Sequence, residues 1–498
     1  MSDRLLGSGR ARASLAAHRW ELLFVSGATL LLYLRFLDGP MRLWDEASYA
    51  TIAHYASAHG YWLVPHIPYD TYVEPTTGVQ PYLRKPPLGF WLQAASMSVF
   101  GRTVVAARLP AVVASGATAA VVYGLGTHLY SRRVGLLAGT IFVAIPQFML
   151  GSHGGRTATF DAPLVFFGTS FLAALYVGAT ERRRRLLMVA GCCFGAAMLT
   201  KGFAAGIFAI VALPFAVAHR EVLLSRWGTE MVLIAVAVPA PWLALASIRH
   251  PDLLTVFVHN QVLDRVSGDL GTAAATFGFM SYPYLREFPE LYSPWTYPFL
   301  PALVGVPVVE GVRRTATRWR TWFVVWWAVA VFCFFAWTGN HGWYIQPMAP
   351  AVALLCALVI QRAMDDRAHR ALLGVGALGV VLFSDTGAKA VELLTAVGLP
   401  AVAATVAVLG AAVLGVAVAP RVDAMAAAVE RIDGRRALSV ALAATVLIQA
   451  GALLAVAGPY DGQAARQQME TGRTIQADGV DAAPLVVQEG IKAPLSNL

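Results

Sequence analysis

The stretch RRRRLLMVAGCCFGAAMLTKGFAAGIFAIVALPFAVAHR, residues 182–220, decides the expected topology of this chain. Its apolar interior, 186–218, fits either one long helix or two short membrane crossings, and basic residues flank it on both sides. Because Lys and Arg gather on the cytoplasmic side of membrane proteins, basic residues at both ends require an even number of crossings. The stretch therefore predicts a helical hairpin whose outer tip is Thr200-Lys201-Gly202.

The composition places the whole chain in a lipid bilayer. Hydrophobic residues make up 57% of it and charged residues 13%, and the mean hydropathy is +0.59, whereas soluble chains carry about 25% charged residues. The net charge of +9 arises from short basic clusters between apolar segments. Such clusters indicate which loops are cytoplasmic, so the charge predicts no nucleic-acid partner. The four cysteines lie inside apolar segments without metal-ligand or disulfide spacing: Cys192, Cys193, Cys333 and Cys356.

The same reasoning along the chain predicts an all-α polytopic membrane protein with about thirteen spanning helices. The predicted spans are 21–37, 104–129, 134–150, 162–180, 186–200, 203–218, 229–247, 296–311, 321–338, 343–361, 371–384, 396–419 and 437–458. Alternate loops are basic, which predicts a cytoplasmic N-terminus and one membrane domain over 1–458. The loops 38–102 and 248–295 and the short tail 459–498 are then extracytoplasmic.

This topology restricts the chemistry. The chain contains no P-loop, and no GxGxxG follows a predicted strand. An extracytoplasmic site has no direct access to nucleotide-activated substrates in the cytoplasm. Any activated donor must therefore reach the site within the membrane, and membrane lipids are the expected surroundings.

The acidic end of loop 38–102 is Trp44-Asp45-Glu46, followed by an amphipathic stretch up to His59 that stops at Gly60. Asp45 is a suitable helix N-cap, with Glu46 in the first turn. A carboxylate at the membrane surface, with its pKa raised by partial burial, is equally suited to act as a general base. Both roles are open for Asp45. The stretch is expected to lie flat on the surface, with one face toward lipid or the protein core: Tyr49, Ile52, Ala53 and Ala56.

The basic end of the loop is Arg84-Lys85-Pro86-Pro87, and Pro87 suits the first position of a helix that runs to Phe100 and stops at Gly101. Free backbone N–H groups at a helix start and two cations together form an anion site. Binding of lipid headgroups by snorkelling side chains is the simpler alternative for the two bases. Their pairing with the acidic end favours a phosphate-binding role.

Several motifs in order resemble the GT-C membrane glycosyltransferases of the aminoarabinose (lipid A) transferase and protein O-mannosyltransferase group. The resemblance covers roughly 40–350. It rests on the following stretches: Trp44-Asp45-Glu46-Ala47-Ser48-Tyr49-Ala50, Trp62-Leu63-Val64-Pro65, Lys85-Pro86-Pro87-Leu88-Gly89-Phe90-Trp91, Arg108-Leu109-Pro110, Asp161, Leu199-Thr200-Lys201-Gly202, His259-Asn260 with Arg265, and Trp343-Tyr344-Ile345-Gln346-Pro347.

The resemblance implies a GT-C fold and a set of site residues. Asp45 matches the base on the acceptor hydroxyl, Asp161 matches a second acidic residue of the cavity, and Glu46 stands beside the base. The residues matched to or expected near the donor phosphate are Lys85, Arg84, Arg265, Tyr344, Lys201 and His341.

Arg84 departs from the family pattern, because the aminoarabinose transferases carry a glutamate at this position. In those enzymes the glutamate and a histidine near the position of His259 hold a metal ion. With a fixed cation at Arg84 we expect no obligatory metal or other cofactor, and His259 is only a weak candidate ligand. His54, His59, His66 and His153 are expected to be interfacial or capping histidines, since they show no metal-ligand spacing.

The expected activity is the transfer of a sugar from a polyprenyl-phosphate donor to a hydroxyl of a glycan, lipid or protein acceptor. Departure of the phosphate builds negative charge on the leaving oxygen and positive charge on the sugar, so cations and a carboxylate are needed. A single displacement by Asp45-assisted attack inverts the anomeric centre.

Two other classes remain open from sequence. A lipid or glycolipid flippase would show ionisable residues at mid-membrane or repeated halves, and an assembly factor would not need the acid and base pairs.

Loop 248–295 is either a lid over the cavity or an ordinary interfacial loop. Pro239 and Pro241 are expected to kink the span that precedes it.

Overall fold

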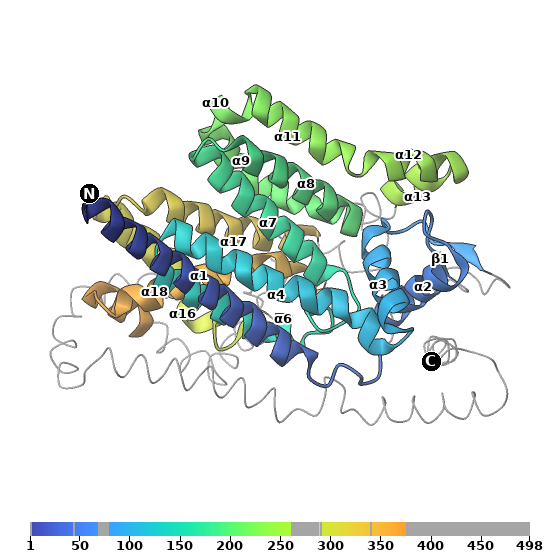
Figure 1. Ribbon diagram of the computed structural model, residues 1–498, viewed down its shortest axis with the longest axis horizontal. Helices are drawn as coiled ribbons and strands as arrows, with labels where there is room; N and C mark the ends of the chain where they lie inside the picture. Colours follow the sequence, from blue (N-terminus) through green and yellow to red (C-terminus); the bar gives the residue numbers. More distant parts are fainter. Residues whose placement is uncertain are drawn as a thin grey trace, which may run out of the picture.

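The computed structural model describes residues 2–42, 45–67, 79–259, 288, 291–338 and 341–374. These residues form a mostly helical bundle with a small cap at one end (Figure 1). Within the described residues, six segments are long and apolar enough to span a membrane: Val104–Leu129, Asp161–Thr180, Arg184–Ala218, Arg226–Arg249, Arg318–Ala336 and Gly342–Ala363.

The elements of the bundle are α1 (Ser2–Leu34), α4 (Val104–Leu129), α5 (Arg132–Val143), α6 (Pro146–Leu150), α7 (Asp161–Thr180), α8 (Arg184–Lys201), η1 (Gly202–Ala205), α9 (Gly206–Ala218), α10 (Arg220–Leu223), α11 (Arg226–Ala237), α12 (Ala240–Arg249), α13 (Leu253–Val258), α16 (Thr296–Val312), α17 (Arg318–Thr338), η4 (Gly342–Met348) and α18 (Ala349–Ala363). The cap consists of α2 (Asp45–His59), β1 (His66–Ile67), β2 (Gln80–Pro81) and α3 (Leu88–Phe100).

The centre of the bundle is built from helices that approach closely. α18 is buried along almost its whole length and packs against α5, α16 and α17. At the α4–α5 contact, a Cβ atom on Gly135 would lie 2.2 Å from Thr127 Oγ1, so only glycine fits there. Small residues at such contacts are typical of membrane helices, because packing, rather than hydrophobic exclusion, holds the helices together.

The predicted hairpin is confirmed. The segment Arg184–Ala218 breaks at η1, and Gly202 adopts a positive φ of 61° there. The two flanks of the segment return to the same end, since Arg182 Nη2 lies 3.5 Å from Glu221 Oε2. A straight helix of 35 residues would separate these ends by roughly 52 Å. Thr200-Lys201-Gly202 is therefore the tip, as the flanking charges predict.

Other spans differ in detail from their predictions. The first helix begins at Ser2 rather than residue 21. The predicted span 134–150 is two helices, because the chain leaves α5 at Ala144 and restarts at Pro146, which lacks the N–H that a continuous helix requires. The predicted kink at Pro239 is confirmed as a break between α11 and α12. Spans 371–384, 396–419 and 437–458 lie largely or wholly outside the described residues, as does the tail 459–498.

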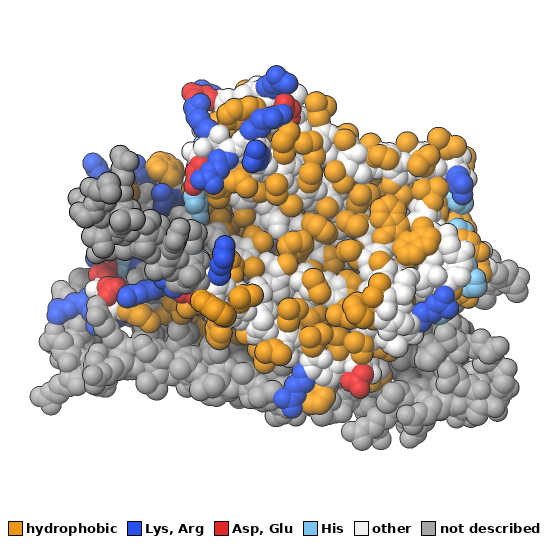
Figure 2. All heavy atoms as spheres, viewed as in Figure 1, with side chains coloured by type: hydrophobic (Ala, Val, Ile, Leu, Met, Phe, Trp, Pro, Cys, Tyr) orange, Lys and Arg blue, Asp and Glu red, His pale blue; other side chains and the backbone are white. Residues whose placement is uncertain are grey.

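The bundle presents an apolar outer surface. Figure 2 shows hydrophobic side chains across the visible face of the helices, with charged side chains gathered at the end near α10. Exposed apolar residues on α11 and α12 include Val232, Leu233, Val236, Leu245 and Ile248. Such a continuous apolar face is expected where helices contact lipid.

The four residues predicted to face inward on α2 are buried, but the predicted amphipathic pattern is wrong, because every residue from Glu46 to Ala53 is buried between the neighbouring elements. Tyr49, Ile52, Ala53 and Ala56 are all at most 3% exposed and pack toward the protein. The helix ends before Gly60, whose φ is 77°, as the sequence suggested. α3 follows Pro87 and ends at Gly101. The cap therefore brings both ends of the loop 38–102 onto one end of the bundle.

Candidate functional site

Asp45 is the first residue of α2 and lies beside His153, which follows α6 in the chain. His153 Nε2 is 3.2 Å from Asp45 Oδ2. The Asp45 side chain is 40% exposed, whereas that of His153 is 10% exposed. A partly open carboxylate therefore rests against a buried imidazole.

His153 is held by an aromatic stack. Its ring lies parallel to the Trp343 ring, with centroids 4.1 Å apart, and His341 stacks on the other face of Trp343 at 4.3 Å. The Gln346 side chain donates to the backbone carbonyl of His153 at 2.9 Å. The stack fixes the imidazole in place and brings η4 against Asp45.

A second acid–base pair lies at the hairpin tip. Lys201 Nζ is 2.6 Å from Asp161 Oδ1, and both side chains are almost buried. Asp161 Oδ2 has no hydrogen-bond partner among the described residues. The Lys201 ammonium also lies 6.0 Å from the centre of the Tyr344 ring. Tyr344 therefore connects this pair to η4 and the His153 stack.

The two acidic residues and the nearby bases share one electrostatic environment. Burial raises the pKa of Asp45, but the hydrogen bond and charge of His153 and the charges of Lys85 and Lys201 outweigh it, so the pKa lies well below its usual range. The pKa of Tyr49 is raised by burial and by the nearby charges of Asp45 and Asp161. Asp45 is thus ionised and Tyr49 neutral. The raised pKa expected for Asp45 is wrong, because His153, Lys85 and Lys201 outweigh the effect of burial on that pKa.

Glu46, expected among the catalytic acids, faces a different region. Its side chain is 1% exposed and pairs with fully buried Arg108 at 2.7 Å. The backbone N–H groups of Arg42 and Ala158 also donate to it, at 2.8 and 2.9 Å. Burial raises the pKa of Glu46, but the charge of Arg108 and these hydrogen bonds hold it below its usual value. The carboxylate is enclosed by donors and therefore holds the fold of the cap.

The remaining predicted residues are placed as follows. Arg84 and Lys85 are half-buried between β2 and α3, and the charge of Lys85 acts on Asp45. Lys201 pairs directly with Asp161 instead of standing alone for a phosphate. His259 is exposed at the end of α13. No group of three metal-ligating side chains occurs among the described residues, and Arg265 lies outside them.

Sequence reasoning missed two residues of this arrangement. His153 was grouped with interfacial histidines because no spacing motif marks it, yet it contacts Asp45. Arg108 was noted only as part of Arg108-Leu109-Pro110, although a buried arginine on an apolar helix signals a charged partner. Both contacts join segments more than sixty residues apart, so local patterns contain no sign of them.

Comparisons with known proteins show what this chain is similar to. Residues 84–245 match the family model described as dolichyl-phosphate-mannose-protein mannosyltransferase. The chain is similar to the undecaprenyl phosphate-alpha-4-amino-4-deoxy-L-arabinose arabinosyl transferase of Pectobacterium carotovorum, with 29% identity over 68% of this chain and 59% of that protein. The enzyme of that name from Pseudomonas savastanoi is 28% identical over 71% of this chain and 64% of that protein.

Among solved structures, ArnT from Cupriavidus metallidurans bound to undecaprenyl phosphate superposes with a TM-score of 0.62 and 20% identity. The match covers 91% of this chain and 79% of that structure, and it shows a shared polytopic membrane fold. The resemblance predicted from the motifs is confirmed. The chain spans about three fifths of the length of the curated relatives it matches.

Proposed function

We propose that this protein is a membrane glycosyltransferase that transfers a sugar from a polyprenyl-phosphate donor to an acceptor hydroxyl. The observation that carries the proposal is the convergence of an ionised carboxylate, Asp45, with the cations Lys85 and Lys201 at one end of the bundle. The relatives are named for transfer of aminoarabinose from undecaprenyl phosphate, which supports a lipid-linked donor here. A pentose is one candidate sugar and a hexose another.

In the proposed reaction the acceptor oxygen attacks the anomeric carbon as the bond from that carbon to the phosphate oxygen breaks. Asp45 takes the acceptor proton, and the electron pair of the broken bond leaves with the phosphate. Cations stabilise the charge that develops on the leaving oxygen. One displacement of this kind inverts the anomeric centre.

The geometry suggests distinct roles for the surrounding residues. Lys85 and Arg84 hold the donor phosphate beside the start of α3, assisted by Tyr344 and His341. Arg265, which lies outside the described residues, is proposed for the same role on the motif resemblance alone. Lys201 orients Asp161 through their 2.6 Å contact, which leaves Asp161 Oδ2 available for a hydroxyl of the sugar or acceptor. His153 positions Asp45. Glu46 acts through its pairing with Arg108, which holds the first turn of α2.

We place the site on the extracytoplasmic face. The arginines of Arg182–Arg185, Arg313–Arg320 and Arg362–Arg370 lie at the ends of the helices remote from Asp45 and indicate the cytoplasmic side. A donor carried by a polyprenyl chain is available on the opposite face, whereas a cytoplasmic nucleotide sugar is not.

The test is transfer of radiolabelled sugar from polyprenyl-phosphate donors by membranes containing the wild-type protein, Asp45→Asn or Lys85→Ala. We expect Lys85→Ala to raise the KM for the donor and Asp45→Asn to lower kcat. The matched control is Arg133→Ala, which removes an exposed cation in the first turn of α5, outside every proposed site motif. Full activity in both site variants would overturn the assignment, and movement of intact donor across the bilayer without transfer would favour a flippase.

A further inference from the structure

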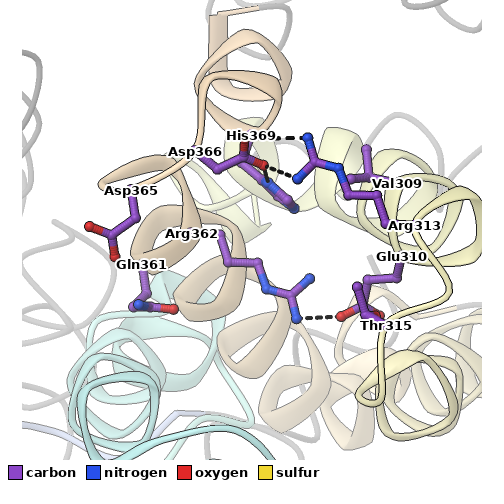
Figure 3. Close-up of a pocket in the computed structure, with 9 residues that line it drawn as sticks. All are labelled: Val309, Glu310, Arg313, Thr315, Gln361, Arg362, Asp365, Asp366 and His369. Atoms are coloured by element: carbon purple, nitrogen blue, oxygen red, sulfur yellow. Dashed lines mark hydrogen bonds and ion pairs between the residues drawn. The ribbon is translucent and has the colours of Figure 1, made fainter.

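A cavity of about 230 Å³, lined by several ionisable residues, lies at the C-terminal end of α18, and Figure 3 shows the side chains that line it. Its walls come from the last turn of α16 and the chain that follows it up to Thr315, and from the last turn of α18 and the chain that follows it up to His369. The 15 residues of α18 separate it from η4 and the Asp45 region, and a helix of that length spans roughly 22 Å. The cavity is therefore a separate site.

Two arginine–carboxylate pairs frame this cavity. Arg362 pairs with Glu310, which is fully buried and also accepts a hydrogen bond of 2.6 Å from Thr317 Oγ1. Arg313 donates to both oxygens of Asp366, at 2.7 and 3.4 Å. Figure 3 shows the Arg313, Arg362 and His369 side chains converging on the same space. The guanidinium charges are already matched by carboxylates, so the cavity is not a simple anion site.

Two buried polar atoms in the cavity wall have no hydrogen-bond partner among the described residues: Glu310 Oε2 and His369 Nε2. His369 Nδ1 contacts Asp366 Oδ2. Burial raises the pKa of Asp366, but Arg313 and His369 outweigh it and bring the pKa to about 2. Asp366 is ionised, so Nδ1 carries the proton that it donates to Asp366.

The two unsatisfied atoms are therefore both hydrogen-bond acceptors. Burial lowers the pKa of His369, which favours the neutral ring and leaves a lone pair on Nε2. Buried polar groups without partners are rare in native structures, and those that line a cavity point to a missing partner. That partner must donate hydrogen bonds. A metal ion does not suit the site, since the described residues provide no group of three metal-ligating side chains.

We propose that this cavity binds a primary ammonium group. An ammonium donates three hydrogen bonds, and its positive charge suits the ionisable residues that line the cavity, because Glu310, Asp365 and Asp366 outnumber Arg313 and Arg362 by one when His369 is neutral. The group has two natural sources, an aminophospholipid headgroup or a small soluble amine. An exposed apolar stripe of α16 leads to the cavity and offers a surface for acyl chains: Leu300, Val304, Val308 and Val312. Arg313 retains further N–H groups for a headgroup phosphate.

The experiment uses the purified full-length protein in nanodiscs with equal amounts of phosphatidylethanolamine and phosphatidylglycerol. Native mass spectrometry then counts the lipid that remains bound. We expect a preference for phosphatidylethanolamine of about tenfold, the effect of one charge-assisted hydrogen bond. Glu310→Gln and His369→Leu should each abolish the preference. Glu230→Gln is the matched control, because Glu230 also pairs with arginines and lies outside the cavity.

His369→Leu leaves the Glu310–Arg362 pair intact, so it decides the outcome if Glu310→Gln does not fold. A parallel titration with free ethanolamine in lipid-depleted detergent identifies the source. Saturable binding of free ethanolamine that is lost in both variants indicates a soluble amine. Binding of phosphatidylethanolamine without binding of free ethanolamine indicates a lipid headgroup. Equal retention of the two lipids without ethanolamine binding, or an unchanged preference in both variants, would overturn the proposal.

Discussion

Asp45 and Glu46 are consecutive residues of α2 whose carboxylates lie in two different regions of the protein. Asp45 is partly open and rests against His153 beside Lys85 and Lys201. Glu46 is enclosed by Arg108 and two backbone N–H groups. Adjacent residues on a helix do not face each other, so one turn serves both regions. The comparison teaches that two consecutive carboxylates can differ in access: Asp45, the proposed base, keeps an open side, whereas donors occupy both oxygens of Glu46.

The largest expected effect is the loss of catalysis in Asp45→Asn. Removal of a general base typically lowers a rate by about 10²–10⁴-fold, and the amide cannot accept the acceptor proton. Sugar transfer in membranes measures the effect, while the thermal midpoint of the purified variant should stay close to that of the wild type. A variant that transfers sugar at the normal rate would remove Asp45 from the reaction.

The next effect is on stability and concerns the Glu46 region. Arg108→Met leaves Glu46 buried without its cation, and such a change costs about 3–5 kcal/mol of unfolding free energy. The thermal midpoint of the detergent-solubilised protein should fall clearly. The double variant Glu46→Leu with Arg108→Met should recover part of the loss, because it removes the unpaired charge as well. Arg132→Met breaks an exposed pair with Glu21 and serves as the control.

A smaller effect is expected from His153→Gln, which disturbs the position of Asp45. We expect transfer to fall by about tenfold to a hundredfold, the range for a misplaced catalytic group. The pH profile gives a second measurement. Burial raises the pKa of Asp45 and His153 helps to lower it, so the variant should have a higher Asp45 pKa. Because the ionised form is active, the acid limb of kcat/KM should move to higher pH.

The control for this variant is His66→Gln, since His66 hydrogen-bonds to the backbone of Val64 in the cap, outside the Asp45 cluster. It should leave the pH profile in place. A purely structural role of His153 would lower the amount of folded protein without moving the acid limb, and that result would contradict a positioning role.

The smallest expected effect is that of metal removal. Arg84 replaces the glutamate of the aminoarabinose transferases, so we predict that EDTA leaves the transfer rate within about twofold of its starting value, less than the loss of one hydrogen bond. Initial rates before and after dialysis against EDTA measure this. Complete loss of activity that one divalent ion restores would show that Arg84 has not replaced a metal.

Local patterns predicted much of the fold. The hairpin at Thr200-Lys201-Gly202 follows from charge at both ends of an apolar segment. Helical spacing predicted only part of the burial of α2, because residues Glu46 to Ala53 are buried on all sides. The break before Pro146 was missed, because the apolar run continues through it and hydropathy does not register a lost backbone donor. The helix count of thirteen stays a prediction.

The candidate site was predicted in part. Asp45, Asp161, Lys85, Lys201, Tyr344 and His341 meet at one end of the bundle, and they were named from motif resemblance. The pairing of Lys201 with Asp161 and the contact of His153 with Asp45 were not predicted. Each joins residues that are distant in sequence, and no local pattern records which distant side chain will lie within hydrogen-bond reach.

The sequence by itself determined that the chain crosses a membrane and that residues 182–220 form two crossings. It also determined that acidic residues lie at one end of the loop 38–102 and basic residues at the other. Those properties depend on the free energy of moving an apolar segment into lipid and on the charge of the loops beside it. Both quantities are sums over residues that are neighbours in the sequence. Only the tertiary structure decided that Glu46 is enclosed beside Arg108, whereas Asp45 rests against His153 and keeps an exposed side. That choice depends on which distant groups, Arg108 or His153, reach each carboxylate once the helices have packed.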